Sequence, residues 1–291
     1  MTQKVDHKYE NLLRDFTSCT FVHYDEQLER HVEIPRFVGP EYIADALQGY
    51  ICKAFDEKDH CYRCIKAAKK EYVEKQLCLD GGNIPENFGY ERDLLRKLAS
   101  MEDCPPSVCQ YICEWTAFEY MYFALQYCSG GNLIFFYFFF VKKKKKLKIV
   151  FFSLKDASQR KYMSEHRQEF CPEDQIYPRL ETIQYIFQQI VYTLHWLHNK
   201  GICHLDLSLE NILICNKDVR HPRIVLIDFG VAVDFGLKKT KNASMWLHNE
   251  NVGKPGYKSF EVKMSDPHRK RRRESQGISE FYDARKADVM A

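Results

Sequence analysis

The stretch that decides the fold reads His204-Leu205-Asp206-Leu207-Ser208-Leu209-Glu210-Asn211, and Asp228-Phe229-Gly230 follows it. Asp206 and Asn211 lie five positions apart and open a short predicted strand over 211–215. A second predicted strand, over 224–227, delivers Asp228 into a tight Phe-Gly turn. Carboxylate and amide oxygens grouped in this way can orient a hydroxyl and hold Mg²⁺ on the phosphates of a nucleotide. The pattern therefore predicts phosphoryl-transfer chemistry.

Length and composition favour one large domain or two lobes with a filled core, because the 291 residues are 45% hydrophobic. The net charge of +3 is too small to indicate nucleic acid, so no such partner is expected. The first residues lack the apolar run of a secretory signal. Twelve cysteines without such a signal predict a reducing compartment, and we expect a cytoplasmic protein. The basic run 269–273 leaves a nuclear location open.

The chain changes character near residue 130. Strands are predicted over 50–55 and 62–67, a helix over 91–98 and a buried strand over 118–127, before Ser129-Gly130-Gly131 breaks the pattern. Beyond this break, apolar residues recur every three or four positions, which predicts a long amphipathic helix. They are Leu180, Ile183, Phe187, Ile190, Val191, Leu194 and Leu197.

Residues 134–151 are of low complexity, with apolar runs on either side of five lysines. The apolar runs are far shorter than the ~20 residues that cross a bilayer, so no membrane span is expected. We expect an insertion without a folded role, and a hairpin at a membrane surface is the alternative.

Several further motifs, in order along the chain, resemble those of the protein kinase family. The strand Arg63-Cys64-Ile65-Lys66 resembles Val-Ala-Ile-Lys, and 123–133 resembles the hinge between the lobes. The segment 253–261 is similar to the end of an activation segment, and 282–289 to the opening of the central helix of the lower lobe. The match runs from about Ala44 to the last residue.

The resemblance implies an α+β, two-lobed protein-kinase-like fold with a β-rich N-lobe and a mainly helical C-lobe. Because the chain stops where the central helix should begin, we expect an incomplete C-lobe and a truncated fragment. The implied organisation is an extension of unknown role over 1–35, the N-lobe over 36–125 and the hinge over 126–133. The insertion 134–151 and a partial C-lobe over 152–291 follow.

The resemblance also implies site residues, with ATP and Mg²⁺ as cofactors. Asp206 would be the catalytic base, and Asn211 and Asp228 would bind Mg²⁺. Lys66, paired with Glu91, would orient the phosphates. The implied nucleotide contacts are Ala44, Gly49, Ile51, Cys64, Lys66, Leu125 as gatekeeper, Gln126, Cys128 and Leu213. His204 would be structural, and Asp288 would brace the backbone of the catalytic loop.

Two departures from the family pattern affect the nucleotide and the activation segment. The stretch 44–51 has one Gly where the family's phosphate loop has three, which predicts weak nucleotide affinity. Leu205 replaces the Arg of His-Arg-Asp, so activity should depend less on phosphorylation at Thr240 or Ser244.

A third departure concerns the charge at the transferred phosphate. Ser208 stands where the family usually carries a Lys, and Lys254 stands where it usually carries a Thr. We expect an exchange in which Lys254 supplies the ammonium and Ser208 takes over the hydroxyl's role. The alternative is the decay of both positions.

The sequence as a whole predicts transfer of the ATP γ-phosphate to Ser or Thr hydroxyls of a protein substrate. The preference for Ser and Thr rests on Glu210 and on the absence of the tyrosine-kinase pattern. The alternatives are a pseudokinase that binds nucleotide or acts as a scaffold, an inactive fragment, and a kinase of small molecules or lipids. The oligomeric state is not predicted.

Overall fold

The computed structural model describes residues 15–25, 27–82, 86–133, 180–215, 218, 221–236, 246–266, 268, 277 and 281–291. The chain forms two compact units. The first comprises the residues up to Ala99 with Gln110–Tyr127, and the second comprises Ser100–Cys109 with Cys128–Ala291. The predicted insertion 134–151, the basic run 269–273, Thr240 and Ser244 lie outside the described residues.

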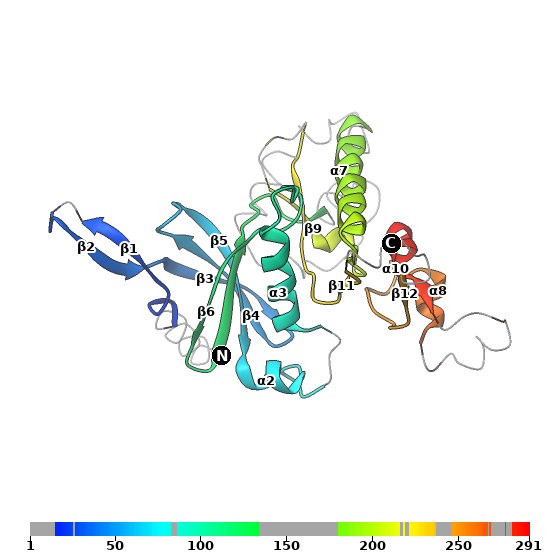
Figure 1. Ribbon diagram of the computed structural model, residues 1–291, viewed down its shortest axis with the longest axis horizontal. Coiled ribbons are helices and arrows are strands. Elements are labelled where there is room, and N and C mark those ends of the chain that lie inside the picture. Colours follow the sequence, from blue (N-terminus) through cyan, green and yellow to red (C-terminus); the bar gives the residue numbers. More distant parts are fainter. Residues whose placement is uncertain are drawn as a thin grey trace, which may run out of the picture. The chain divides into compact units, whose positions relative to one another are not determined.

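The first unit is built on a five-stranded antiparallel sheet of order β3-β4-β5-β7-β6 (Figure 1). Its strands are β3 (Phe37–Ala46), β4 (Gly49–Asp56), β5 (Cys61–Lys69), β6 (Tyr111–Ala117) and β7 (Tyr120–Gln126). The strands predicted over 50–55 and 62–67 lie within β4 and β5. The prediction that a buried strand begins at Phe118 is wrong: Phe118 is 58% exposed in the turn before β7, because its positive φ of 46° suits a turn.

Residues ahead of the sheet pack against it. Strands β1 (Thr20–Asp25) and β2 (Arg30–Pro35) form an antiparallel hairpin (Figure 1). Just before the hairpin, Phe16 is 1% exposed and contacts Trp115 and Tyr122 edge-on. The buried Asp15 carboxylate accepts a hydrogen bond of 2.6 Å from the Tyr122 hydroxyl. Phe16, in the described part of the predicted extension 1–35, therefore belongs to the core of the first unit.

The described residues of the first unit include the helices α2 (Lys70–Lys75) and α3 (Phe88–Ala99). The Asn87 side chain caps α3 by accepting a hydrogen bond of 2.9 Å from the amide of Tyr90. Leu94, Leu95 and Leu98 form its buried stripe, as their spacing predicted, and Glu91 lies on the same buried side.

The second unit contains the long helix α7 (Leu180–Asn199), with Gly201 at a φ of 81° just beyond its end. The amphipathic helix that the spacing predicted is present, and its apolar stripe is exposed over the first three turns. Phe187 is 63% exposed and Val191 is 48% exposed, whereas Thr182 and Ile186 are buried. Toward the C-terminal end of α7, the stripe residues Leu194 and Leu197 are buried, together with Thr193 and Trp196.

Short strands and helices form the rest of the described part of the second unit. They are β8 (Ile202–Cys203), η1 (Leu209–Asn211), β9 (Ile212–Ile214), β10 (Ile224–Leu226), β11 (Val233–Asp234), β12 (Leu247–His248), α8 (Phe260–Met264), β13 (Tyr282–Asp283) and α10 (Ala284–Met290). Strand β9 pairs with β10, β8 with β11, and β12 with β13. Asn211 ends the 3-10 turn η1 instead of opening the strand predicted over 211–215. Among the described residues, no helix has the length and apolar character needed to cross a membrane.

Candidate active site

In the first unit, Lys66 on β5 and Glu91 on α3 form an ion pair. The Lys66 ammonium donates to both carboxylate oxygens of Glu91, at 2.7 and 2.9 Å. The side chains are 18% and 5% exposed, so the pair is largely shielded from water. A shielded carboxylate held by two hydrogen bonds fixes the direction of the ammonium, which would otherwise be flexible.

Several predicted nucleotide contacts of the first unit share one face of the sheet with Lys66. Ala44 pairs with Ile51, and Ile51 pairs with Lys66. Two residues before Lys66, Cys64 pairs with Leu125 on β7. Directly paired residues, and residues two apart on one strand, point to the same side of a sheet. The register therefore gathers these side chains around the ammonium.

The β3–β4 connection replaces the family's phosphate loop with a tight two-residue turn, Leu47–Gln48. Gln48 is buried, and its side-chain amide donates to the carbonyls of Tyr72 and Leu77, at 2.9 and 3.2 Å. The amide of Leu79 donates to the carbonyl of Leu47 at 2.8 Å. The tip of this hairpin is thus tied to the segment around α2.

The packing of neighbouring strands requires a glycine at position 49 of this hairpin. A Cβ at Gly49 would lie 2.1 Å from the carbonyl oxygen of Ala67, a distance that no side chain tolerates. Gly49 permits the close approach of β4 to β5. The remaining contacts predicted for the nucleotide divide between the units: Gln126 ends β7 in the first, whereas Cys128 and Leu213 lie in the second, where Leu213 bridges to Asn132.

In the second unit, Asp206 and Asn211 are joined within the catalytic loop, residues 204–211. The side-chain amide of Asn211 donates to Asp206 Oδ2 at 2.7 Å and to the Asp206 carbonyl at 2.8 Å. The other carboxylate oxygen, Asp206 Oδ1, is buried and has no hydrogen-bond partner within the described part of the chain. Burial raises the pKa of the Asp206 carboxyl, against the opposing attraction of the Lys254 ammonium. This oxygen is an open acceptor for a proton.

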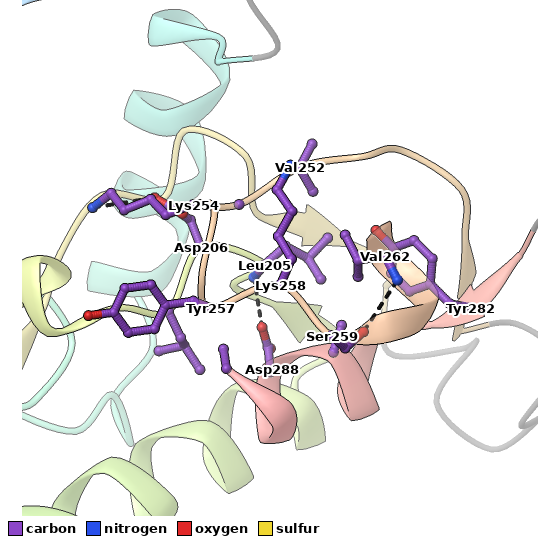
Figure 2. Close-up of a pocket in the computed structure, with 14 residues that line it drawn as sticks. Leu205, Asp206, Val252, Lys254, Tyr257, Lys258, Ser259, Val262, Tyr282 and Asp288 are labelled. Carbon is purple, nitrogen blue, oxygen red and sulfur yellow. Dashed lines mark hydrogen bonds and ion pairs between the residues drawn. The ribbon is translucent and has the colours of Figure 1, made fainter. Parts of the chain in front are cut away.

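Lys254 lies against the same loop. Its ammonium donates to Ser208 Oγ at 3.0 Å and to Asn211 Oδ1 at 2.9 Å. It also lies 3.9 Å from Asp206 Oδ2, and Figure 2 shows these two side chains together. The two positions for which the sequence predicted an exchange are therefore in direct contact.

Asp288 at the inner side of α10 holds the backbone of the loop (Figure 2). Its carboxylate accepts from the amides of His204 and Leu205, at 2.9 and 2.7 Å, and lies 2.9 Å from the ring of His198. Leu205 has a φ of 62°, a strained conformation for this residue type that a buried anchor can maintain. The ring of His204 is 3.0 Å from the carbonyl of Ile227, which suits a structural role.

Leu205 belongs to an apolar cluster that includes Trp246 and Val252 of the segment after Asp228-Phe229-Gly230. An Arg at this position would bring a charge that needs an anionic partner. Leu205 instead contacts the segment through apolar side chains. The weaker dependence on phosphorylation stays a prediction, because Thr240 and Ser244 lie outside the described residues.

Asp228 directly follows the short strand β10 and its neighbour Ile227. The amide of Ile227 donates to the carbonyl of Asn211 at 2.9 Å, so the segments that carry Asn211 and Asp228 are bonded to each other. Asp228 has a φ of 68°, a strained conformation of the kind found at functional sites. Carboxylate and amide oxygens suit Mg²⁺, and the second lone pair of Asn211 Oδ1 is compatible with a metal beside Lys254. The residues present fit this ion.

A cavity of about 20 Å³ adjoins the catalytic loop, and the residues that line it include Leu205, Asp206, Lys254, Tyr282 and Asp288 (Figure 2). This volume admits about one water molecule, so the cavity is far too small for a nucleotide.

Sequence reasoning missed two contacts at the site. It did not single out Tyr257, whose hydroxyl neighbours Glu210 and Leu209, or the tie between Gln48 and α2. Neither contact has a local sequence signal, because each joins segments far apart in the chain.

Comparison with known proteins agrees with this arrangement. The family described as protein kinase domain matches residues 46–272, and the chain belongs to this family. Serine/threonine-protein kinase KSP1 of Saccharomyces cerevisiae is 26% identical over 237 residues, which are 81% of this chain and 17% of the yeast protein. Meiosis-specific serine/threonine-protein kinase MEK1 of the same yeast is 40% identical over 82 residues, 28% of this chain and 15% of that protein.

A third relative is the calcium/calmodulin-dependent protein kinase type II of Caenorhabditis elegans. It is 35% identical over 83 residues, which are 28% of this chain and 10% of that protein. The chain thus spans less than a fifth of the length of each of these relatives.

Proposed function

We propose that this chain transfers the γ-phosphate of ATP to Ser or Thr hydroxyls of a protein substrate. One observation supports this above the others: the buried Oδ1 of Asp206 lacks a hydrogen-bond partner among the described residues, while Oδ2 is held by Asn211. A carboxylate oriented through one oxygen and open at the other can accept the proton of an attacking hydroxyl. The family and the names of the relatives support the choice of a phosphoryl acceptor of this kind.

The other residues divide the remaining work. Lys66, oriented by Glu91, binds the phosphates of ATP, and the face of the sheet around it receives the nucleotide. Asn211 and Asp228 are the residues that hold Mg²⁺, which neutralises phosphate charge when bound. Glu210, with a buried carboxylate oxygen that lacks a partner in the described part of the chain, is positioned to favour basic substrates.

The experiment is transfer of labelled γ-phosphate from Mg-ATP to a library of Ser- and Thr-containing peptides, with tyrosine peptides as the comparison. We expect labelled Ser or Thr, and basic residues near the acceptor. Asp206→Asn should lower the rate about 10²- to 10⁴-fold, because it removes the proton acceptor. Asp218→Asn, at a side chain that is 50% exposed, is the matched control and should leave the rate unchanged.

The second candidate is a pseudokinase that binds nucleotide without transferring phosphate. The tied β3–β4 hairpin favours it, since a fixed tip without glycines cannot close over phosphates as a flexible loop does. A melting experiment separates the candidates, because a ligand at a hundredfold excess over its Kd adds roughly 2.7 kcal/mol to stability. Stabilisation by Mg-ATP without peptide labelling would favour the pseudokinase.

The proposed location is the cytoplasm or the nucleus. It rests on the twelve cysteines and on the basic run 269–273. Fluorescence imaging of the tagged chain, with and without substitution of this basic run, distinguishes the two compartments.

A further inference from the structure

We propose that Lys254 is a catalytic residue whose ammonium donates a hydrogen bond to the phosphoryl group during its transfer. The inference rests on the proposed kinase function and names the side chain that supplies positive charge at that step. The catalytic loop 204–211 itself contains no Lys or Arg, so the charge has to come from another segment.

The ammonium of Lys254 is held in place by two hydrogen bonds, and it has a third N–H donor. A lysine has three N–H donors. Two of them go to neutral acceptors, Ser208 Oγ at 3.0 Å and Asn211 Oδ1 at 2.9 Å. Asp206 Oδ2, at 3.9 Å, lies beyond hydrogen-bond distance, and no other partner is seen among the described residues. One donor and most of the positive charge therefore remain for a ligand.

The side chain is also accessible at the right place. It is 35% exposed, whereas Asp206 beside it is 11% exposed and Ser208 is buried. A phosphoryl group that approaches the hydroxyl oriented by Asp206 would meet this ammonium first. A half-shielded cation next to the point of transfer stabilises developing negative charge more strongly than one in open water.

The backbone conformation just before Lys254 keeps its ammonium close to the catalytic loop. Gly253 has a φ of 89°, and a Cβ there would lie 2.7 Å from the carbonyl oxygen of Leu205. The bare backbone at Gly253 thus lies directly on the catalytic loop. Amides of Tyr257 and Lys258 then donate to the carbonyl of Lys254, at 3.1 and 3.3 Å, which closes a turn. This turn and the contact at Gly253 fix the start of the Lys254 side chain.

The step balances without a further reactant. The oxygen of the acceptor hydroxyl forms a bond to the γ-phosphorus of ATP, while the bond from that phosphorus to the bridging oxygen breaks. ADP leaves with the electron pair of the broken bond, and the hydroxyl proton passes to the Asp206 carboxylate. Lys254 donates a hydrogen bond to a non-bridging oxygen throughout and exchanges no covalent bond.

A purely structural role is the competing explanation, in which Lys254 only ties its segment to the loop. Binding of two nucleotides separates the explanations. Calorimetry gives the Kd of Mg-ADP and of a Mg-bound ATP analogue whose γ-phosphate cannot be transferred. Lys254→Met should weaken binding of the analogue about tenfold more than that of ADP, the size of one charge-assisted hydrogen bond. The transfer rate should fall about 10²- to 10³-fold.

Two further variants complete the test. Lys258→Met, in the same segment but with its ammonium on Asn251, should change the affinity ratio and the rate by less than about twofold. The double variant Ser208→Lys with Lys254→Thr moves the ammonium onto the loop. Its transfer rate should be at least about tenfold higher than the rate of Lys254→Thr alone, because the positive charge returns to the same place.

The outcomes distinguish this inference from the proposed function. An unchanged ratio of the two affinities in Lys254→Met overturns the inference, whatever happens to the rate. If the original chain transfers phosphate and Lys254→Met has that unchanged ratio, only the inference fails. If the original chain transfers none, yet Lys254→Met loses its preference for the analogue, the proposed function fails and the contact of Lys254 with the γ-phosphate stands. A chain that binds neither nucleotide overturns both.

Discussion

Lys66 donates to both carboxylate oxygens of Glu91, and the Glu91 side chain is only 5% exposed. The pair joins the central strand of the sheet to the helix packed on it. It fixes the direction of the Lys66 ammonium on one face of this sheet.

Glu91→Gln tests the value of this pair. The neutral amide cannot hold the ammonium by charge, so we expect kcat/KM for ATP to fall about tenfold to hundredfold. Steady-state kinetics at varied ATP measures the effect. Glu71→Gln is the matched control, since Glu71 binds Lys75 at 2.8 Å on exposed α2 with a side chain 67% exposed. Equal losses in both variants would show that the buried pair has no special part in nucleotide use.

Asp56 should stabilise the first unit in a pH-dependent way. Its side chain is 0% exposed and accepts from Arg36 at 3.0 and 2.9 Å. Burial alone would raise the pKa of Asp56, but the hydrogen bonds and charges of Arg36 and Arg63 outweigh it and hold the pKa below its usual range. Because the folded-state pKa is lowered, this stability is present above the unfolded pKa of about 3.9 and is lost as the pH falls through the folded value.

The corresponding variant is Asp56→Asn, which leaves Arg36 without its buried partner. We expect the variant to lose about 3 kcal/mol in the free energy of unfolding at neutral pH. This difference from the original chain should become smaller as the pH drops below about 4. Urea unfolding at several pH values measures it. Asp59 is a second partner of Arg36, and its side chain is 35% exposed. Asp59→Asn should therefore lower the free energy of unfolding by less than about 1 kcal/mol. A loss for Asp56→Asn that is constant with pH would contradict the assignment.

Gln48→Ala tests the tied tip of the β3–β4 hairpin. The variant leaves the carbonyls of Tyr72 and Leu77 without the buried amide that donates to them. We therefore expect the free energy of unfolding to fall by about 1–3 kcal/mol. Hydrogen exchange at Leu79 should accelerate, because its amide is bonded to the neighbouring carbonyl of Leu47. Gln110→Ala, at an exposed side chain of the same unit, should alter neither quantity. Unchanged exchange at Leu79 in Gln48→Ala would mean that the tip is held by other contacts.

Two neighbouring glycines, Gly253 and Gly256, allow a matched pair of alanine variants that differ in whether the added Cβ contacts the catalytic loop. Gly253 and Gly256 have φ values of 89° and 104°, so Ala costs about 1–3 kcal/mol of backbone strain at either position. Of the two, only Gly253 would bring the added Cβ within 4 Å of other described atoms, and the nearest is the Leu205 carbonyl oxygen at 2.7 Å. Gly253→Ala should therefore displace Lys254 and lower the transfer rate, while Gly256→Ala should mainly lower the melting temperature. Similar rates in the two variants would argue against the close approach at Gly253.

Local patterns predicted the elements that alternation and helical spacing define. The strands around Tyr50 and Ile65 and the buried leucines of α3 follow directly from such spacing. The spacing from Leu180 to Leu197 predicted helix α7, but periodicity does not show how much of an apolar face the neighbouring segments cover: Val191 is exposed, whereas Leu197 is buried.

The site divides in the same way. Motif order indicated Lys66 with Glu91, and Ser208 with Lys254, and the structure brings each pair into contact. The burial of Asp15 and the anchoring of Gln48 depend on contacts with residues far along the chain, for which a single sequence carries no periodic signal.

The most direct test of the central claim is the single-turnover rate of γ-phosphate transfer from Mg-ATP, measured with the chain and with Asp206→Asn. We predict phosphate on Ser or Thr of the acceptor and a rate about 10²- to 10⁴-fold lower in the variant. Equal rates in the two proteins, or no transfer by the original chain at saturating Mg-ATP, would contradict the assignment of Asp206 as the residue that accepts the proton.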